Sequence, residues 1–142
     1  MDQPADVAGL IEALSHALAP DEIISEPATR ERLSSDVYSE GETADLVIRP
    51  ADRQRLAQAV GLMTGLGFAV FPRGGGMSYT GGYLPDRRKA VVVDTSALDA
   101  ILDVSPENMT ITVEAGVTWK AIYETLAPLG LRLPFFGTFS GA

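Results

Sequence analysis

The sequence predicts an α+β fold: a small three-stranded parallel β/α unit and then the beginning of an antiparallel α+β part, preceded by a helical arm. Between residues 44 and 96, short apolar runs alternate with a helical repeat, as in parallel sheets crossed by helices. Residues 101–114 alternate around a turn, as in a hairpin. Residues 7–18 carry apolar side chains at helical spacing.

The acidic arm, residues 1–43, is predicted to be mainly helical. A first helix is expected from about Pro4 to Ala19, and a short second helix from Pro27 to Leu33. Residues 34–43 are polar and predict a surface loop. The side chains that define the first helix recur every three or four residues: Val7, Leu10, Ile11, Leu14 and Leu18.

The parallel unit is predicted from three apolar strands and one helix. Leu46–Ile48 and Phe68–Phe71 flank a helix over Ala51–Leu66. This order implies that the first two strands form a parallel pair with a right-handed crossover. Val91–Val93 is apolar throughout, which is typical of a strand covered on both faces.

A hairpin and a helix are predicted to follow. Ile101–Ser105 and Met109–Glu114 flank the turn-forming residues 106–108. Thr118 is a typical N-cap for a helix through Leu129, and Gly130 is a typical C-terminal stop.

A glycine-rich stretch from Phe71 to Gly82 follows the second predicted strand, with glycine at five of its twelve positions. Glycine allows backbone N–H groups to turn inward and form a nest for phosphate oxygens. Arg73 adds a charged fork that matches such oxygens. The loop leaves the carboxyl end of a strand, where open α/β sheets bind ligands. The pattern favours a phosphate-bearing ligand, and a wide surface turn is the alternative.

Two common phosphate loops are excluded. The chain has no Gly-Lys-Ser or Gly-Lys-Thr. A dinucleotide fingerprint beginning at Gly74 would need glycine at position 79, where Tyr79 stands. Gly81, Gly82 and Pro85 also argue against a helix after the loop. The loop itself would therefore hold the ligand.

Charge and composition exclude several classes of function. The net charge is −8, and residues 1–45 carry 11 acidic and 2 basic residues, a net charge of −9. Such a balance argues against nucleic acid as a partner. The absence of cysteine excludes disulfides and thiolate metal sites, and nothing predicts another metal site. No apolar run is long enough for a membrane helix, and residues 1–18 lack the basic residues of a targeting signal, so a cytoplasmic location is expected.

Five segments in a fixed order carry a family resemblance. They are residues 44–50, 73–78, 90–96, 108–119 and 133–142. In order and spacing the series resembles the N-terminal part of the FAD-binding domain of FAD-linked oxidases. This superfamily includes vanillyl-alcohol oxidase, p-cresol methylhydroxylase and the D-lactate and glycolate dehydrogenases.

The resemblance implies a division of the chain and a set of FAD contacts. It makes residues 44–96 a first FAD-binding subdomain and 97–142 the beginning of a second, antiparallel one, truncated at its end, with the flavin between them. Arg73 would either bind phosphate or fix the loop by pairing with a neighbouring carboxylate. The residues expected to bind the cofactor are Pro72, Arg73, Gly74, Gly75, Gly76, Met77, Ser78, Tyr79, Gly82, Gly137, Thr138 and Ser140.

Several members of the resembling family carry a histidine just after the glycines and link it covalently to the flavin. This chain has Met77 there, and its single histidine, His16, lies in the arm. The resemblance therefore implies non-covalent FAD.

The implied function is that of an FAD-binding fragment of a flavin-dependent oxidase or dehydrogenase acting on a hydroxy acid or alcohol. Its catalytic part would lie outside this chain, so the chain alone would be inactive, and no catalytic residue is identified. One alternative is a non-catalytic nucleotide-binding module. Another is a folded remnant that binds no cofactor and forms homo-oligomers through exposed aromatic residues near its C-terminus, Phe135, Phe136 and Phe139.

Overall fold

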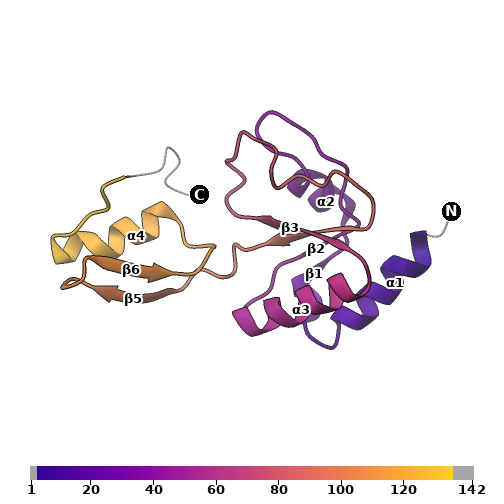
Figure 1. Cartoon of the computed structure of the whole chain (residues 1–142), viewed down its shortest axis with the longest axis horizontal. Helices are drawn as coiled ribbons and strands as arrows, with labels where there is room; N and C mark the ends of the chain where they lie inside the picture. The colour runs from indigo at the N-terminus through magenta and orange to yellow at the C-terminus, as the bar shows by residue number, and fades with distance from the viewer. Residues whose placement is uncertain (1–2, 136–142) are drawn as a thin grey trace.

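The structure is a computed structural model and describes residues 3–135, with side chains from residue 6 onward. Figure 1 shows two parts. The larger contains one sheet with helices on both faces, and the smaller contains a hairpin and one helix. The segment that follows strand β4 (Ala90–Asp94) joins them.

The sheet of the larger part has the strand order β1-β2-β4-β3, in which β1 is Ile23–Ile24. Its parallel strands are β2 (Leu46–Ile48), β3 (Ala69–Arg73) and β4 (Ala90–Asp94). The expected direct pairing of the first two strands is wrong, because β4 lies between them. All of β4 is buried, as suits a central strand, whereas β3 contains Pro72, which cannot donate to a ladder and is tolerated at an edge.

The arm contributes a fourth strand that the sequence did not predict. β1 (Ile23–Ile24) pairs antiparallel with β2. Two residues are too few to show a periodicity, so only its pairing reveals this strand. The α+β class and the three parallel strands are confirmed, and the antiparallel strand extends the sheet.

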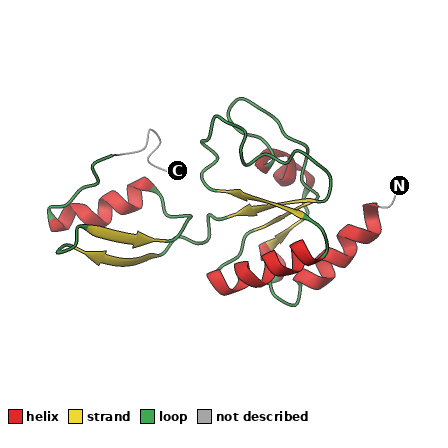
Figure 2. Cartoon of the chain, viewed as in Figure 1, coloured by secondary structure: helices red, strands yellow, loops and turns green. Residues whose placement is uncertain are grey.

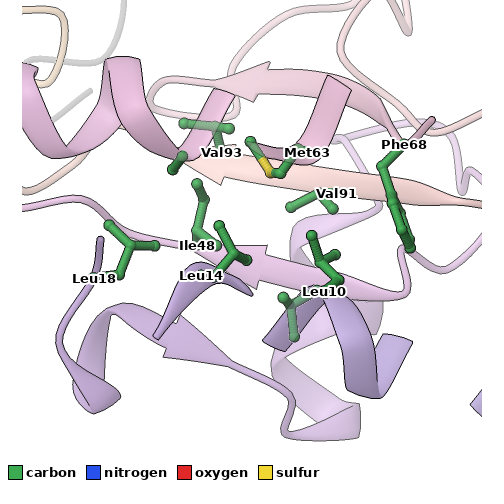
Figure 3. Packing of buried hydrophobic residues seen from close by; sticks show 10 residues of the cluster. Leu10, Leu14, Leu18, Ile48, Met63, Phe68, Val91 and Val93 are labelled. Carbon is green, nitrogen blue, oxygen red and sulfur yellow. The ribbon is translucent and has the colours of Figure 1, made fainter. Parts of the chain in front are cut away.

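Helices cover both faces of the sheet. α1 (Gln3–Leu14) and α3 (Arg53–Gly65) pack on one face and α2 (Pro27–Leu33) on the other. The first helix ends earlier than the expected Ala19, because a turn and a short 3₁₀ helix at Pro20–Glu22 follow Leu14. Figure 3 shows the core between α1, α3 and the sheet, which includes Leu10, Leu14, Leu18, Ile48, Met63, Phe68, Val91 and Val93.

Glu22 joins the arm to the beginning of α3. Its carboxylate accepts hydrogen bonds from the N–H groups of Ala19 and Ala51 and from Arg55 Nη1, which lies 2.8 Å away. Burial would raise the pKa of the Glu22 carboxyl, but these hydrogen bonds together outweigh it and hold the pKa below its ordinary value. The ionised form therefore ties the arm to the beginning of α3.

The smaller part agrees with the prediction. β5 (Ile101–Ser105) and β6 (Thr110–Val113) form the antiparallel hairpin, and α4 (Trp119–Leu126) follows it (Figure 2). Thr118 accepts a hydrogen bond from Ala121 N–H as the N-cap. A 3₁₀ turn then ends at Gly130, whose φ of 70° lies in the left-handed region that glycine favours.

Within residues 3–135, the structure contains no helix long and apolar enough to cross a membrane. The same residues contain no group of three or more histidine, cysteine or carboxylate side chains placed to hold a metal ion.

Candidate functional site

A cleft of about 220 Å³ lies at the carboxyl edge of the sheet, where the two parts of the molecule meet. β3 and β4 both end at this edge, where Arg73 and Asp94 are neighbouring positions in the parallel strand register. The walls of the cleft come from three segments: the glycine-rich loop after β3, the segment after β4, and the turn between β6 and α4. The lining residues are Gly74, Gly75, Ser96, Asp99, Ala115, Gly116, Val117, Thr118 and Ala121.

Gly116 brings two of these walls together. Its N–H donates to the carbonyl oxygen of Leu98 at 2.8 Å. A Cβ at this position would overlap the carbonyl oxygen of Thr95. The turn before α4 therefore lies directly against the segment after β4, and only glycine permits this approach.

The glycine-rich loop presents unpaired backbone donors. Within the described residues, none of the backbone N–H groups from Gly74 to Tyr79 donates to a protein acceptor. Gly74, Gly75 and Tyr79 are exposed, so donors of this loop are accessible, and a run of accessible backbone N–H groups is suited to an anionic ligand. A Cβ at Gly74 would have no protein atom within 4 Å, so the space beside this cleft residue is open.

Gly76 shows why this loop needs glycine in its middle. Its φ is 72°, in the left-handed region. A Cβ there would also overlap the guanidinium of Arg73, which lies against it. The Gly76 carbonyl oxygen accepts a hydrogen bond of 2.8 Å from the hydroxyl of Tyr83. The loop backbone is thus held by side chains at this point.

In the described part of the chain, Arg73 does not pair with a neighbouring carboxylate, which was one of the two roles that the sequence suggested for it. Its Nη1 donates to the carbonyl oxygens of Ser35 at 2.6 Å and Leu33 at 3.2 Å. Its guanidinium also lies over the Tyr83 ring, 5.0 Å from the centroid. Among the salt bridges of residues 6–135, none joins Arg73 to a carboxylate. The side chain binds neutral carbonyl groups of the arm instead.

The second half of the loop turns towards the arm and away from the cleft. The exposed Tyr79 packs edge-to-face against Tyr38, with 5.3 Å between the ring centroids. Ser78 Oγ lies 3.0 Å from Thr80 Oγ1. In Figure 1 this loop runs beside the loop that follows α2, and the hydrogen bond from Glu42 N–H to the Pro85 carbonyl joins the same two segments.

An ion pair between Arg49 and Asp94 stabilises the wall of the cleft that carries Ser96. Asp94 Oδ2 lies 2.8 Å from both Nε and Nη2 of Arg49. Asp94 Oδ1 accepts a hydrogen bond from Ser96 N–H. Burial would raise the pKa of the Asp94 carboxyl, but the hydrogen bonds from Ser96 and the Arg49 charge together hold the pKa below its ordinary value. The ionised carboxylate fixes the segment that carries Ser96 into the cleft.

The structure divides the predicted site residues into groups. Only Gly74 and Gly75 line the cleft, while Gly76, Met77 and Ser78 continue the loop behind them. Gly137, Thr138 and Ser140 lie outside the described residues. The sequence analysis missed Ser96, Asp99 and residues 115–118 of the opposite wall. The position of Ser96 just after β4, at the carboxyl edge, is the signal that would have indicated it.

The residues that line the cleft lie within a segment that matches a known protein family. A model of the FAD binding domain family matches residues 44–141. This chain belongs to the FAD binding domain family. The match confirms the resemblance to FAD-linked oxidases, and its residues include all three walls of the cleft.

Solved structures share the fold of this FAD binding domain. A p-cresol methylhydroxylase with bound substrate aligns with a TM-score of 0.81 and 16% identity, over 98% of this chain and 28% of that one. An alkyldihydroxyacetonephosphate synthase aligns with a TM-score of 0.79 and 19% identity, over 89% and 28% of the two chains. A 4-ethylphenol oxidase from Gulosibacter chungangensis, in complex with isoeugenol, aligns with a TM-score of 0.73 and 19% identity, over 90% and 25%. The chain therefore spans between 25% and 28% of the length of these proteins.

The residues of the cleft fit a dinucleotide such as FAD. The free N–H groups of the loop match the acceptor oxygens of a pyrophosphate, and Gly74 leaves room for it. Asp99 also lines the cleft, and a carboxylate is an acceptor that suits ribose hydroxyl donors. The cleft therefore combines donors for the anionic part of a dinucleotide with an acceptor for its neutral part.

Proposed function

We propose that this chain binds FAD non-covalently in the cleft at the carboxyl edge of the sheet. The observation that carries the proposal is the run of free backbone N–H groups from Gly74 to Tyr79. The N–H groups of Gly74 and Gly75, in the cleft, would hold the pyrophosphate, and those of Gly76, Met77 and Ser78 would continue this cradle. Ser96 and Asp99 of the opposite wall would contact the rest of the nucleotide. Pro72, Tyr79 and Gly82 flank this cradle, and Gly137, Thr138 and Ser140 would extend it towards the flavin ring.

We further propose that residues 44–96, in the larger part, and residues 97–142 act as two FAD-binding subdomains with the flavin between them. The cleft lies at their junction and takes residues from both. The arm, residues 1–43, would support the first subdomain through β1 and the core contacts of α1.

The test of FAD binding is a titration of the purified chain, followed by flavin fluorescence and visible absorption. Gly74→Val is the informative variant, because a side chain at Gly74 meets no protein atom yet enters the space beside the cleft. Gly9→Val is the matched control, since a Cβ at Gly9 also meets nothing within 4 Å, but in α1. Saturable binding that Gly74→Val abolishes and Gly9→Val retains is expected. Equal affinity of the two variants would refute this location.

Non-covalent attachment is proposed because Met77 occupies the position just after the glycines. Methionine cannot form the covalent bond to the flavin that a histidine at this position forms in several members of the resembling family. Acid precipitation of the FAD-loaded protein separates the two cases. All of the flavin is expected in the supernatant, and flavin that stays with the protein pellet would contradict the proposal.

We propose that the chain is the FAD-binding part of a flavin-dependent oxidase or dehydrogenase that acts on a hydroxy acid or alcohol. The catalytic part of that enzyme would lie outside residues 1–142. When bound, FAD accepts the electrons of the substrate, while the residues described here bind and orient it. The chain alone is expected to reduce no dye with such substrates. Turnover by the purified chain would overturn this proposal.

The exposed apolar side chains of the smaller part favour a second candidate, self-association without a cofactor. Met109, Leu129 and Phe135 are 73%, 53% and 66% exposed. An adjoining groove of about 590 Å³ is lined largely by apolar residues such as Leu131. Light scattering over a concentration series, with and without FAD, tests this candidate. It predicts oligomers that FAD does not affect and that Met109→Glu disrupts.

A further inference from the structure

We propose that Arg73 and Tyr83 are positioning residues for the glycine-rich loop. They hold the loop backbone at Gly76 on the side that faces the arm, and they do not bind phosphate themselves. The inference rests on the proposed FAD site and goes beyond it, because it assigns the loop's shape to contacts with the arm. We call Arg73, Tyr83 and the carbonyl groups of Leu33 and Ser35 the brace.

The guanidinium of Arg73 is committed to the brace. It donates to the carbonyl oxygens of Leu33 and Ser35, lies 5.0 Å from the centroid of the Tyr83 ring, and fills the space where Gly76 would carry a Cβ. The carbonyl oxygen of Arg73 itself accepts hydrogen bonds from Thr95 N–H at 3.0 Å and Thr95 Oγ1 at 3.2 Å. Both the backbone and the side chain of Arg73 are therefore fixed on the protein side of the loop.

The hydroxyl of Tyr83 sets the direction of one peptide group. It donates to the carbonyl oxygen of Gly76 at 2.8 Å. In a trans peptide the C=O and N–H groups point in opposite directions, and the described chain has no cis peptide bond. The N–H of Met77 therefore points away from Tyr83, and it is one of the donors without a protein acceptor. The brace thus turns a cradle donor outward.

The electrostatic surroundings keep Tyr83 a donor. Burial raises the pKa of the Tyr83 hydroxyl above its ordinary value, and Asp36 adds to this effect while Arg73 opposes it. The phenol therefore stays protonated at neutral pH. Asp36 itself accepts hydrogen bonds of 2.7 Å from the N–H groups of Tyr38 and Ser39, so the same arm loop supplies this charge.

Two variants with matched controls test the brace. Tyr83→Phe removes only the hydroxyl, and Tyr38→Phe removes one from a tyrosine that is 77% exposed. Arg73→Gln removes the charge and the stacked guanidinium, and Arg87→Gln removes a charge from an exposed arginine paired with Asp86. Each variant is measured without ligand, by ¹⁵N relaxation order parameters of residues 74–80, and by FAD titration at two salt concentrations.

The brace predicts lower loop order parameters in Tyr83→Phe and Arg73→Gln, but not in their controls. FAD affinity should fall about fivefold in Tyr83→Phe, as expected for one lost hydrogen bond, and more in Arg73→Gln. The salt dependence of FAD affinity in Arg73→Gln should equal that in Arg87→Gln.

Two results would overturn the inference. One is unchanged loop order in both brace variants. The other is a salt dependence that falls further in Arg73→Gln than in Arg87→Gln, which would make Arg73 a direct phosphate ligand. If the wild-type chain binds no FAD, the proposed function fails, but the order parameters still decide whether Arg73 and Tyr83 hold the loop.

Discussion

Replacing Gly116 by alanine tests how closely the two parts of the molecule are joined. The added Cβ would overlap the carbonyl oxygen of Thr95 and lie 2.9 Å from that of Leu98. Both are backbone atoms of one short segment, so neither moves aside as a flexible side chain does. Either the turn before α4 or the segment after β4 must shift, and both line the cleft.

The magnitude follows from this overlap. Forcing an extra methyl group into a packed site costs about 1–3 kcal/mol. Gly61 offers a control of opposite sign, because it is exposed within α3 and an added Cβ meets no atom within 4 Å. Alanine there should stabilise the helix by about 1 kcal/mol. For a chain of this size, each kcal/mol corresponds to roughly 3 °C in Tm.

Thermal and urea unfolding, followed by circular dichroism, measure both variants. Gly116→Ala is expected to lower Tm by roughly 3–9 °C, while Gly61→Ala raises it by roughly 3 °C. Gly116→Ala should also weaken FAD binding, and Gly61→Ala should not. A Gly116→Ala protein as stable as the wild type would refute the close packing at this junction.

Three further predictions concern the larger part. Glu22→Gln should lower the free energy of unfolding by about 2 kcal/mol at pH 7, because charged hydrogen bonds are lost. Because the pKa of Glu22 is lowered in the folded state, its contribution is complete above about pH 5 and is lost as the pH falls through the folded pKa. The difference in unfolding free energy between wild type and Glu22→Gln, measured by urea unfolding, should therefore be smaller at pH 3 than at pH 7. Asp94→Asn should likewise destabilise the protein at pH 7 and do so less as the pH falls, and it should also weaken FAD binding, since Asp94 holds Ser96. Unchanged FAD affinity would contradict a role of this hydrogen bond in shaping the cleft. Met63→Ala, at a fully buried position, should cost about 2–5 kcal/mol in urea unfolding, and a cost below 1 kcal/mol would contradict the packing in Figure 3.

The sequence by itself determined the local elements and the presence of a glycine-rich loop after the second parallel strand. α2, β2 and β5 have the predicted limits, and Thr118 caps α4 as expected. These features depend on residues a few positions apart, through side-chain periodicity and hydrogen bonds from a side chain to the next turn. The glycine content of the loop is likewise readable, because it reflects the conformational freedom of single residues.

Only the tertiary structure decided the order of the strands, the second wall of the cleft and the partners of Arg73. β4 lies between β2 and β3, although it follows both in the chain. Arg73 meets the carbonyl oxygen of Ser35, which lies 38 positions earlier. Such contacts leave no local pattern, because any exposed carbonyl group satisfies a guanidinium equally well. Which one does so depends on how the arm packs against the sheet, and that packing is a property of the whole core.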